Sequence, residues 1–304
     1  MWVGYLGRVA GEQVVFSADF SYNTQTERKT GKNIFVEKQM STHLSMTSRQ
    51  NAPESVYVLG VRVDRISQEQ ALERMMEMIA ERRACENRLS CRQVITVNPE
   101  FVMAAQRNAD FLRAINAAAL VVADGIGVVW ATRYLKAPTP ERITGVDTLV
   151  ALARRSAGAG YRIYLLGAAP GVAEEAAARL QSLAPGLQIA GTYAGSPAPA
   201  EEDEIIERVR AARADILCVA YGAPAQDLWI YRNLARLPAA LAIGVGGAYD
   251  FISGRQQRAP RLMQRLGIEW LYRLYREPWR WRRMLALPRF AFRVIVKGRA
   301  QHGT

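Results

Sequence analysis

Polar side chains that could act on a substrate follow two short apolar runs in this chain. The run Leu120–Ala123 ends in Asp124, while the run Gln93–Val97 contains Thr96 and leads into Asn98. Each run has the length of a buried strand, and a helix-like segment follows each one. Ligands bind at the carboxyl edge of open α/β sheets, so we expect these three side chains to line one pocket. A helix N-cap is the alternative role for Asn98 and for Asp124.

Histidine is scarce, which narrows the choice of a catalytic base. The chain has 2 His, both in polar or terminal segments. If the protein is an enzyme, a carboxylate such as that of Asp124 is therefore the expected general base. The 3 Cys (Cys85, Cys91 and Cys218) lack the spacing of a zinc site and fit a reducing cytosol. We expect neither a metal site nor a disulfide between the first two of them.

Glycines gather at the ends of three further apolar runs. The segments LLGAAPG, YGAPAQD and GVGGAYDF contain Gly167, Gly222, and the pair Gly246 and Gly247. Glycine lets a backbone approach a ligand closely, and helix N-termini attract phosphate, so these residues are candidates for binding a nucleotide or a nucleotide sugar. None of the segments has the spacing of a P-loop or of a full dinucleotide fingerprint. This disfavours an NTPase and a nucleotide-dependent oxidoreductase.

Strand-like runs alternate with helical patterns along most of the chain. Val56–Val63 alternates like a single strand, and Ser67 with Gln70 forms a capping-box pattern for a helix that ends near Arg83. This alternation predicts an α/β fold, a Rossmann-like and mainly parallel sheet with helices on both faces. No apolar stretch is long enough to span a membrane, and we expect no secretory signal.

Composition divides the chain into three expected segments. Residues 1–54 are polar and aperiodic, which indicates a flexible N-terminal extension, and residues 55–254 hold the strand and helix patterns of the core. Residues 255–304 form a basic, helical C-terminal appendage. Between residues 255 and 299, thirteen Arg and Lys side chains stand against Glu269 and Glu277, a net charge of +11 in a chain whose total is +12.

Aromatic side chains are interleaved with these basic residues, Trp270, Trp279 and Trp281 among them. A basic amphipathic helix rich in Trp is typical of an element that lies on an anionic membrane surface. Nucleic acid binding is one alternative, and a helix packed on the core with a solvated basic face is another. The density of Trp favours the membrane, so we expect no nucleic acid partner. Removal of the chain from Arg261 onward is expected to leave a folded core.

An ordered set of motifs resembles one enzyme family. TVNPEFV, VADGIGVVWA, PERITGVD, YLLGA, YGAPAQDLWI, GVGGAYDFISG and RAPRLMQRLGIEWLYRLYREPWRWRRM occur in this order. From about Val56 to Phe292 the chain is similar to the WecG/TagA/CpsF glycosyltransferases, family 26. The resemblance implies an inverting transferase that moves a sugar from a UDP donor to a polyprenyl-diphosphate-linked sugar, without a metal or other cofactor. It also implies a peripheral protein on the cytoplasmic face of the bacterial inner membrane, serving teichoic acid, enterobacterial common antigen or exopolysaccharide synthesis.

The resemblance assigns roles to the matching residues. Asp124 would be the general base, with Thr96 and Asn98 lining the sugar pocket beside it. Arg142 would contact the acceptor or stabilise charge near the base. Gln226 would contact the donor, next to the substrate-binding glycines named above. The residues expected at the lipid diphosphate or the membrane are Arg261, Arg273, Arg276, Arg280, Arg282, Arg283, Trp270 and Trp279.

The identity of the donor sugar stays open at this point. Asp227 stands where relatives commonly have Glu, and Ala225 where they commonly have Lys, and both changes touch the donor side. N-acetylmannosamine, its uronic acid and glucose are the candidate sugars. The alternative function is a nucleotide-binding scaffold without catalysis, docked on a membrane or on nucleic acid, which would not need Asp124. The sequence also leaves open whether the chain forms a homo-oligomer.

Overall fold

The computed structural model describes residues 8–9, 12–13, 53–85, 89–265 and 267–301. The chain divides into two compact units, residues 1–52 and residues 53–304. In the first unit, β1 (Arg8–Val9) pairs antiparallel with β2 (Glu12–Gln13). The remainder of that unit, and with it most of the expected flexible extension, lies outside the described residues.

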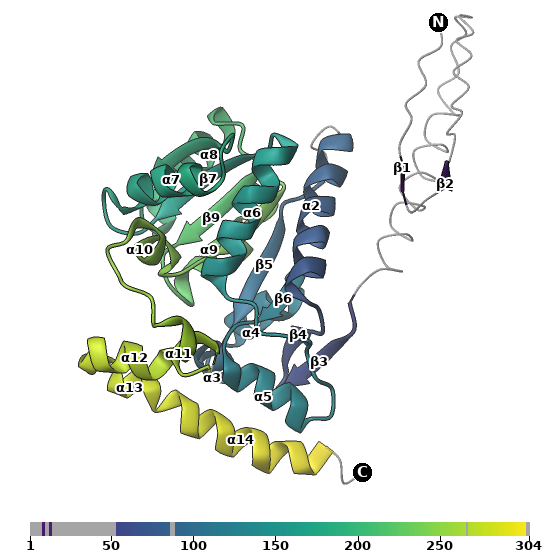
Figure 1. Cartoon of the computed structure of the whole chain (residues 1–304), viewed down its shortest axis with the longest axis vertical. Coiled ribbons are helices and arrows are strands. Elements are labelled where there is room, and N and C mark those ends of the chain that lie inside the picture. Colours follow the sequence, from purple (N-terminus) through teal and green to yellow (C-terminus); the bar gives the residue numbers. More distant parts are fainter. Residues whose placement is uncertain (1–7, 10–11, 14–52, 86–88, 266, 302–304) are drawn as a thin grey trace, which may run out of the picture. The chain divides into compact units, whose positions relative to one another are not determined.

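A parallel six-stranded sheet forms the centre of the second unit (Figure 1). The strand order is β6-β5-β10-β9-β7-β8, and every neighbouring pair is parallel. The strands are β5 (Arg92–Val97), β6 (Leu120–Ala123), β7 (Arg162–Gly167), β8 (Gln188–Tyr193), β9 (Ile216–Ala220) and β10 (Leu241–Gly244). The α/β, Rossmann-like prediction is therefore confirmed.

Alternate side chains of the strands enter hydrophobic cores on opposite faces of the sheet. On β6, Leu120 and Val122 pack into one core, whereas Val121 and Ala123 pack into the other. The first face is covered by α2 (Gln68–Ala84), α6 (Gly145–Ala159), α7 (Val172–Leu183) and α10 (Ala248–Ser253). The second is covered by α3 (Pro99–Ala105), α4 (Ala109–Ala117), α5 (Ile126–Tyr134), α8 (Glu202–Ala211) and α9 (Ala225–Asn233), with η1 (Pro199–Glu201) leading into α8.

Helix α2 begins at the capping box that the sequence predicts. The Ser67 side chain accepts a hydrogen bond from the Gln70 N–H, and the Gln70 side chain accepts one from the Ser67 N–H. Cys85 follows α2 and Cys91 precedes β5, and both are free, as is Cys218 in β9.

A hairpin replaces the single strand expected over Val56–Val63. β3 (Ser55–Val58) pairs antiparallel with β4 (Val61–Asp64) outside the main sheet. The chain turns at Leu59 and Gly60, which have φ of 52° and 81°, and glycine adopts such values without strain. The single-strand prediction was wrong: both arms of the hairpin present valines to the core, but the alternation changes phase at the turn, from Val56 and Val58 to Val61 and Val63.

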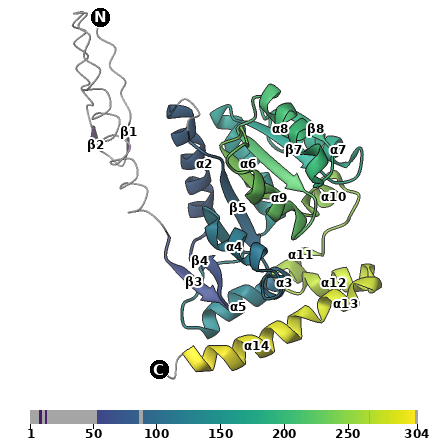
Figure 2. The same ribbon diagram turned by 180° about the vertical axis from the view of Figure 1, so that it is seen from behind.

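The C-terminal segment is a chain of short helices that ends in a long one. It consists of α11 (Arg261–Arg265), α12 (Glu269–Arg276), η2 (Pro278–Arg280), α13 (Trp281–Met284) and α14 (Ala286–Gln301). Figure 2 shows α14 running along α3 and α5, where Phe290 and Val294 are buried in the same core as Phe101 and Val128. Part of the expected appendage therefore belongs to the core packing of the second unit. Within the described residues, no helix has the length and hydropathy of a membrane span.

Candidate active site

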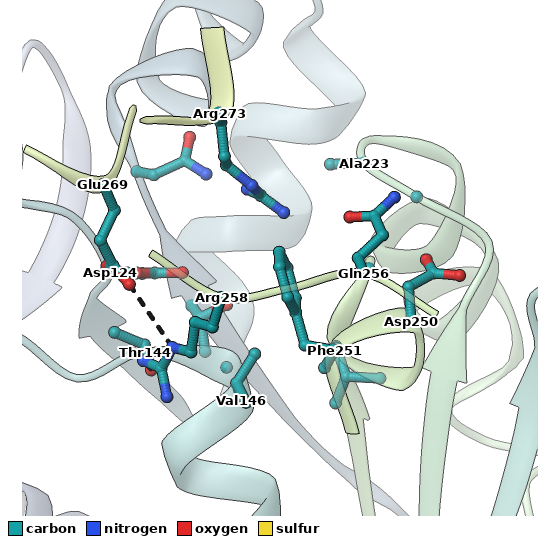
Figure 3. Close-up of a pocket in the computed structure, with 18 of the residues that line it drawn as sticks. Asp124, Thr144, Val146, Ala223, Asp250, Phe251, Gln256, Arg258, Glu269 and Arg273 are labelled. Carbon is teal, nitrogen blue, oxygen red and sulfur yellow. Dashed lines mark hydrogen bonds and ion pairs between the residues drawn. The ribbon is translucent and has the colours of Figure 1, made fainter. Parts of the chain in front are cut away.

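A cavity of about 280 Å³ lies at the carboxyl edge of the sheet (Figure 3). Residues that follow β5, β6, β9 and β10 form its walls, and side chains of α12 enter it from the opposite side. The structure brings together these predicted site residues, which all line the cavity: Thr96, Asn98, Asp124, Gly222, Gln226, Gly246, Gly247, Arg273 and Arg283. Parallel strands place their carboxyl ends at one edge, which is why segments so far apart in sequence meet here.

Asp124 follows β6 and lines the cavity. The N-cap residue of α5 is Gly125, and no side chain caps that helix, so the alternative role of Asp124 as an N-cap is wrong. The backbone N–H of Gly145 donates a hydrogen bond to the carboxylate. Burial raises the pKa of Asp124 to about 6, against the lowering effect of Arg142 and Arg273, and Glu269 raises it further. A carboxylate with this pKa is ionised at neutral pH and basic enough to accept a proton.

Thr96 and Asn98 form the wall beside Asp124. Thr96 is buried near the end of β5. Asn98 is the N-cap of α3, and its Oδ1 accepts a hydrogen bond of 3.0 Å from the Phe101 N–H. Asn98 therefore both caps α3 and lines the cavity, because α3 starts at the edge of the sheet where the cavity opens.

Gln226 joins two loops of the cavity. Its Oε1 accepts hydrogen bonds from the N–H groups of Gly222 (3.1 Å) and Gly246 (3.0 Å), which follow β9 and β10. The next residue, Asp227, is fully buried, and burial raises its pKa to about 7. Sequence reasoning treated Asp227 only as a departure from related sequences and did not predict its burial.

An ion-pair network closes the side of the cavity next to Asp124. Glu269 at the start of α12 pairs with Arg142 (2.6 Å) and with Arg258 (3.4 Å), and Arg258 also pairs with Asp147 of α6 (2.5 Å). Arg142 thus lies near Asp124 as expected, although it reaches the site through Glu269. Sequence reasoning missed Glu269 and Arg258 as site residues. It counted Glu269 only as an opposing charge, although the residue stands within the GIEWLYRL motif.

The comparison with protein families decides which family the chain belongs to. The model of the family described as "Glycosyl transferase WecG/TagA/CpsF family" matches residues 56–303. The chain belongs to the WecG/TagA/CpsF family of glycosyltransferases. The range of the match includes both the sheet and the C-terminal helices, so every residue that lines the cavity falls within it.

Two similar proteins of Bacillus have curated descriptions. Both are described as N-acetylglucosaminyldiphosphoundecaprenol N-acetyl-beta-D-mannosaminyltransferase. The Bacillus spizizenii protein is 34% identical over 207 residues, which cover 68% of this chain and 80% of that protein. The Bacillus subtilis protein is 35% identical over 202 residues, which cover 66% of this chain and 78% of that protein.

The Arg and Trp residues that the family resemblance assigned to the lipid diphosphate or the membrane differ from one another in their surroundings. Arg273 lies in the cavity with its guanidinium 4.7 Å from the ring centre of Phe251, while Arg283 pairs with Glu100 of α3 (2.6 Å). Arg276, Arg282, Trp270 and Trp279 are exposed to solvent. The side chains of Arg261 and Arg280 lie outside what the structure describes.

Gly167 lies outside the cavity that the other predicted glycines line. It ends β7, and a Cβ atom on it would lie 2.8 Å from the backbone carbonyl carbon of Ala220 in the neighbouring strand β9. Close packing of the two strands therefore accounts for this glycine. Among the described residues, no group of three or more His, Cys, Asp and Glu is placed to hold a metal ion.

Proposed function

We propose that this chain transfers N-acetylmannosamine from a UDP donor to a polyprenyl-diphosphate-linked sugar, with inversion at the anomeric carbon and Asp124 as the base. The observation that supports this most directly is the position of Asp124. It lies in the cavity of a glycosyltransferase family member, with a pKa of about 6 and with Arg142 and Arg273 nearby. The names of the two Bacillus relatives support the choice of sugar and of lipid-linked acceptor.

In the proposed reaction, Asp124 takes the proton from the acceptor hydroxyl as its oxygen attacks the anomeric carbon. The bond between that carbon and the diphosphate oxygen breaks, and its electron pair leaves with UDP. A single displacement of this kind inverts the anomeric configuration. Arg273 enters the cavity and can stabilise the negative charge that develops on the diphosphate, as preorganised donors do in enzymes. The proposed step uses no metal ion.

We further propose that the C-terminal helices dock the enzyme on the cytoplasmic leaflet, where a lipid-linked acceptor would lie. Large apolar side chains are exposed there beside the basic residues: Leu262, Trp270, Leu271, Tyr275, Trp279, Trp281, Leu285, Phe292 and Val296. Basic residues attract anionic headgroups, and Trp prefers the membrane interface. Docking by this surface would bring the cavity to the headgroup layer.

The test is a transfer assay on the full chain with UDP-N-acetylmannosamine, its uronic acid and UDP-glucose, each with an N-acetylglucosaminyl-diphospho-polyprenol acceptor. We expect UDP release and a disaccharide-linked lipid with the first donor, and the same rate after treatment with EDTA. Absence of product with every donor would refute the proposed transfer. Loss of activity in EDTA with recovery in Mg²⁺ or Mn²⁺ would refute the metal-independent step.

A further inference from the structure

Helix α12 presents two charged side chains to the cavity although it has little hydrophobic anchorage of its own. Glu269 and Arg273 are four residues apart, so they lie on the same face of the helix, and both line the cavity (Figure 3). None of the eight residues of α12 is buried, and Trp270, Leu271 and Tyr275 on its other faces are exposed. Tyr272 and Leu274 are only half-buried, so polar contacts carry a larger share of the anchorage of α12 than they do in a core helix.

Glu269 makes contacts that could hold the helix. Its Oε2 accepts a hydrogen bond from Arg142 Nη1 at 2.6 Å, and its Oε1 lies 3.4 Å from Arg258 Nε. Arg258 is itself fixed to α6, because its guanidinium donates to both carboxylate oxygens of Asp147, at 2.5 and 2.8 Å. Only about a fifth of the side-chain surface of Arg142 and of Glu269 is exposed, so water screens this pair less than a surface pair.

We propose that Glu269 is a positioning residue that fastens α12 to the core through Arg142 and Arg258, and thereby sets Arg273 in the cavity beside Asp124. The effect on catalysis rests on the proposed transfer, whereas the fastening of the helix does not. Arg273 adds one contact of its own to the core, the stacking on Phe251 of α10. The carboxylate of Glu269 joins α12 to Arg142, and Arg142 also faces Asp124, the proposed base.

Glu269 also acts on Asp124 through its charge. The charged groups that face Asp124 are Arg142, which precedes α6, and Glu269 and Arg273 of α12. The negative charge of Glu269 raises the pKa of Asp124, and it also partly neutralises Arg142. Replacement of Glu269 by neutral Gln removes this repulsive neighbour, which lowers the pKa of Asp124, whereas displacement of Arg273 from the cavity raises it.

The fastening can be tested without any substrate. Hydrogen–deuterium exchange is measured over residues 269–276 in the full chain, for wild type, Glu269→Gln and the control Glu175→Gln. Glu175 pairs with Arg255 at 2.7 Å, so the control also removes an Arg–Glu pair between the segment after α10 and a core helix, but outside the cavity. We expect faster exchange over α12 in Glu269→Gln alone. Wild-type exchange in Glu269→Gln would overturn the proposal.

The transfer assay supplies the second measurement. We expect kcat/KM of Glu269→Gln to fall about tenfold or more, because displacement of a catalytic group by ~1 Å can cost ~10²-fold. Glu269→Asp, which keeps the charge, should stay closer to wild type than Glu269→Gln in both kcat/KM and the acid limb of the pH profile. A kcat/KM of Glu269→Gln equal to that of wild type would overturn the positioning role. If wild type itself forms no product with any donor, the proposed function fails, and the exchange measurement still decides whether Glu269 fastens α12.

Discussion

Asp124, which follows β6, and Asp227, which lies in α9, both have raised pKa values, and only Asp124 lines the cavity. For Asp124, whose pKa is about 6, we expect kcat/KM to fall tenfold per pH unit below that value, because the protonated acid accepts no proton. Asp124→Asn should lose ~10²–10⁴ in turnover at pH 8 while its circular dichroism and thermal midpoint stay near those of wild type. Turnover close to wild type in this variant would reject Asp124 as the base.

Asp227 should affect stability. Burial raises the pKa of Asp227 to about 7 from an unfolded value of about 4, and the polar contacts of its carboxylate with Gln226 and with its own backbone offset only part of this effect. Between these values the folded state binds more protons than the unfolded state, so the contribution of Asp227 to stability declines as pH rises from 4 to 7.

We therefore expect the thermal midpoint of Asp227→Asn, measured relative to that of wild type, to be higher at pH 8 than at pH 5. The change should be roughly 2–4 °C for each kcal/mol of stability that wild type loses over this range. The control is Asp203→Asn, because 88% of the Asp203 side chain is exposed. Its midpoint difference from wild type should be the same at both pH values. An equal difference at both values for Asp227→Asn would contradict an ionisation change at this site.

At the scale of elements, α14 has one face in the core and another in solvent. Phe290 is 1% exposed and Phe292 is 68% exposed, two residues apart on the same helix. Phe290→Ala should lower the free energy of unfolding by about 3–5 kcal/mol in a urea titration, whereas Phe292→Ala should change it by less than about 0.5 kcal/mol. Equal losses in both variants would show that α14 does not pack as described.

Removal of the chain from Arg261 onward would take away the buried face of α14. This truncation should therefore destabilise the core, contrary to what the sequence alone suggests.

At the scale of the whole molecule, the net charge of +12 is concentrated in the C-terminal helices. We expect the full chain to sediment with vesicles of anionic lipid, and less so in 0.5 M salt, where screening shortens the range of the attraction. Arg282→Glu should weaken this binding roughly tenfold, since each basic residue near such a surface contributes ~1 kcal/mol.

The matched control for this measurement is Arg179→Glu, an exposed arginine on α7, remote from the C-terminal helices in sequence. It changes the net charge by the same amount and should bind vesicles almost as wild type does. Equal weakening by both substitutions would indicate attraction by net charge without a docking surface. Preference for DNA or RNA over anionic vesicles would favour the nucleic acid alternative.

Much of the fold and part of the site follow from local sequence. Periodic apolar runs determine the strands and helices, and the carboxyl ends of parallel strands meet at one edge, so Thr96, Asn98 and Asp124 could be predicted to share a pocket. Composition likewise indicated a basic, aromatic C-terminal surface. These features depend on neighbours within one or two helical turns, which a sequence displays directly.

Tertiary structure alone decided the contacts between distant segments. Glu269 meets Arg142 across 127 residues, and Arg258 meets Asp147 across 111, and no local pattern shows which of these charges pair with one another. Burial of Asp227 depends on how α9 packs on the sheet. The hairpin at Gly60 was missed although the alternation changes phase there, because a change of phase alone does not distinguish a reversal of the chain from a bulge within one strand. Such contacts arise from the strand order and helix packing, which bring together residues whose local patterns are independent of one another.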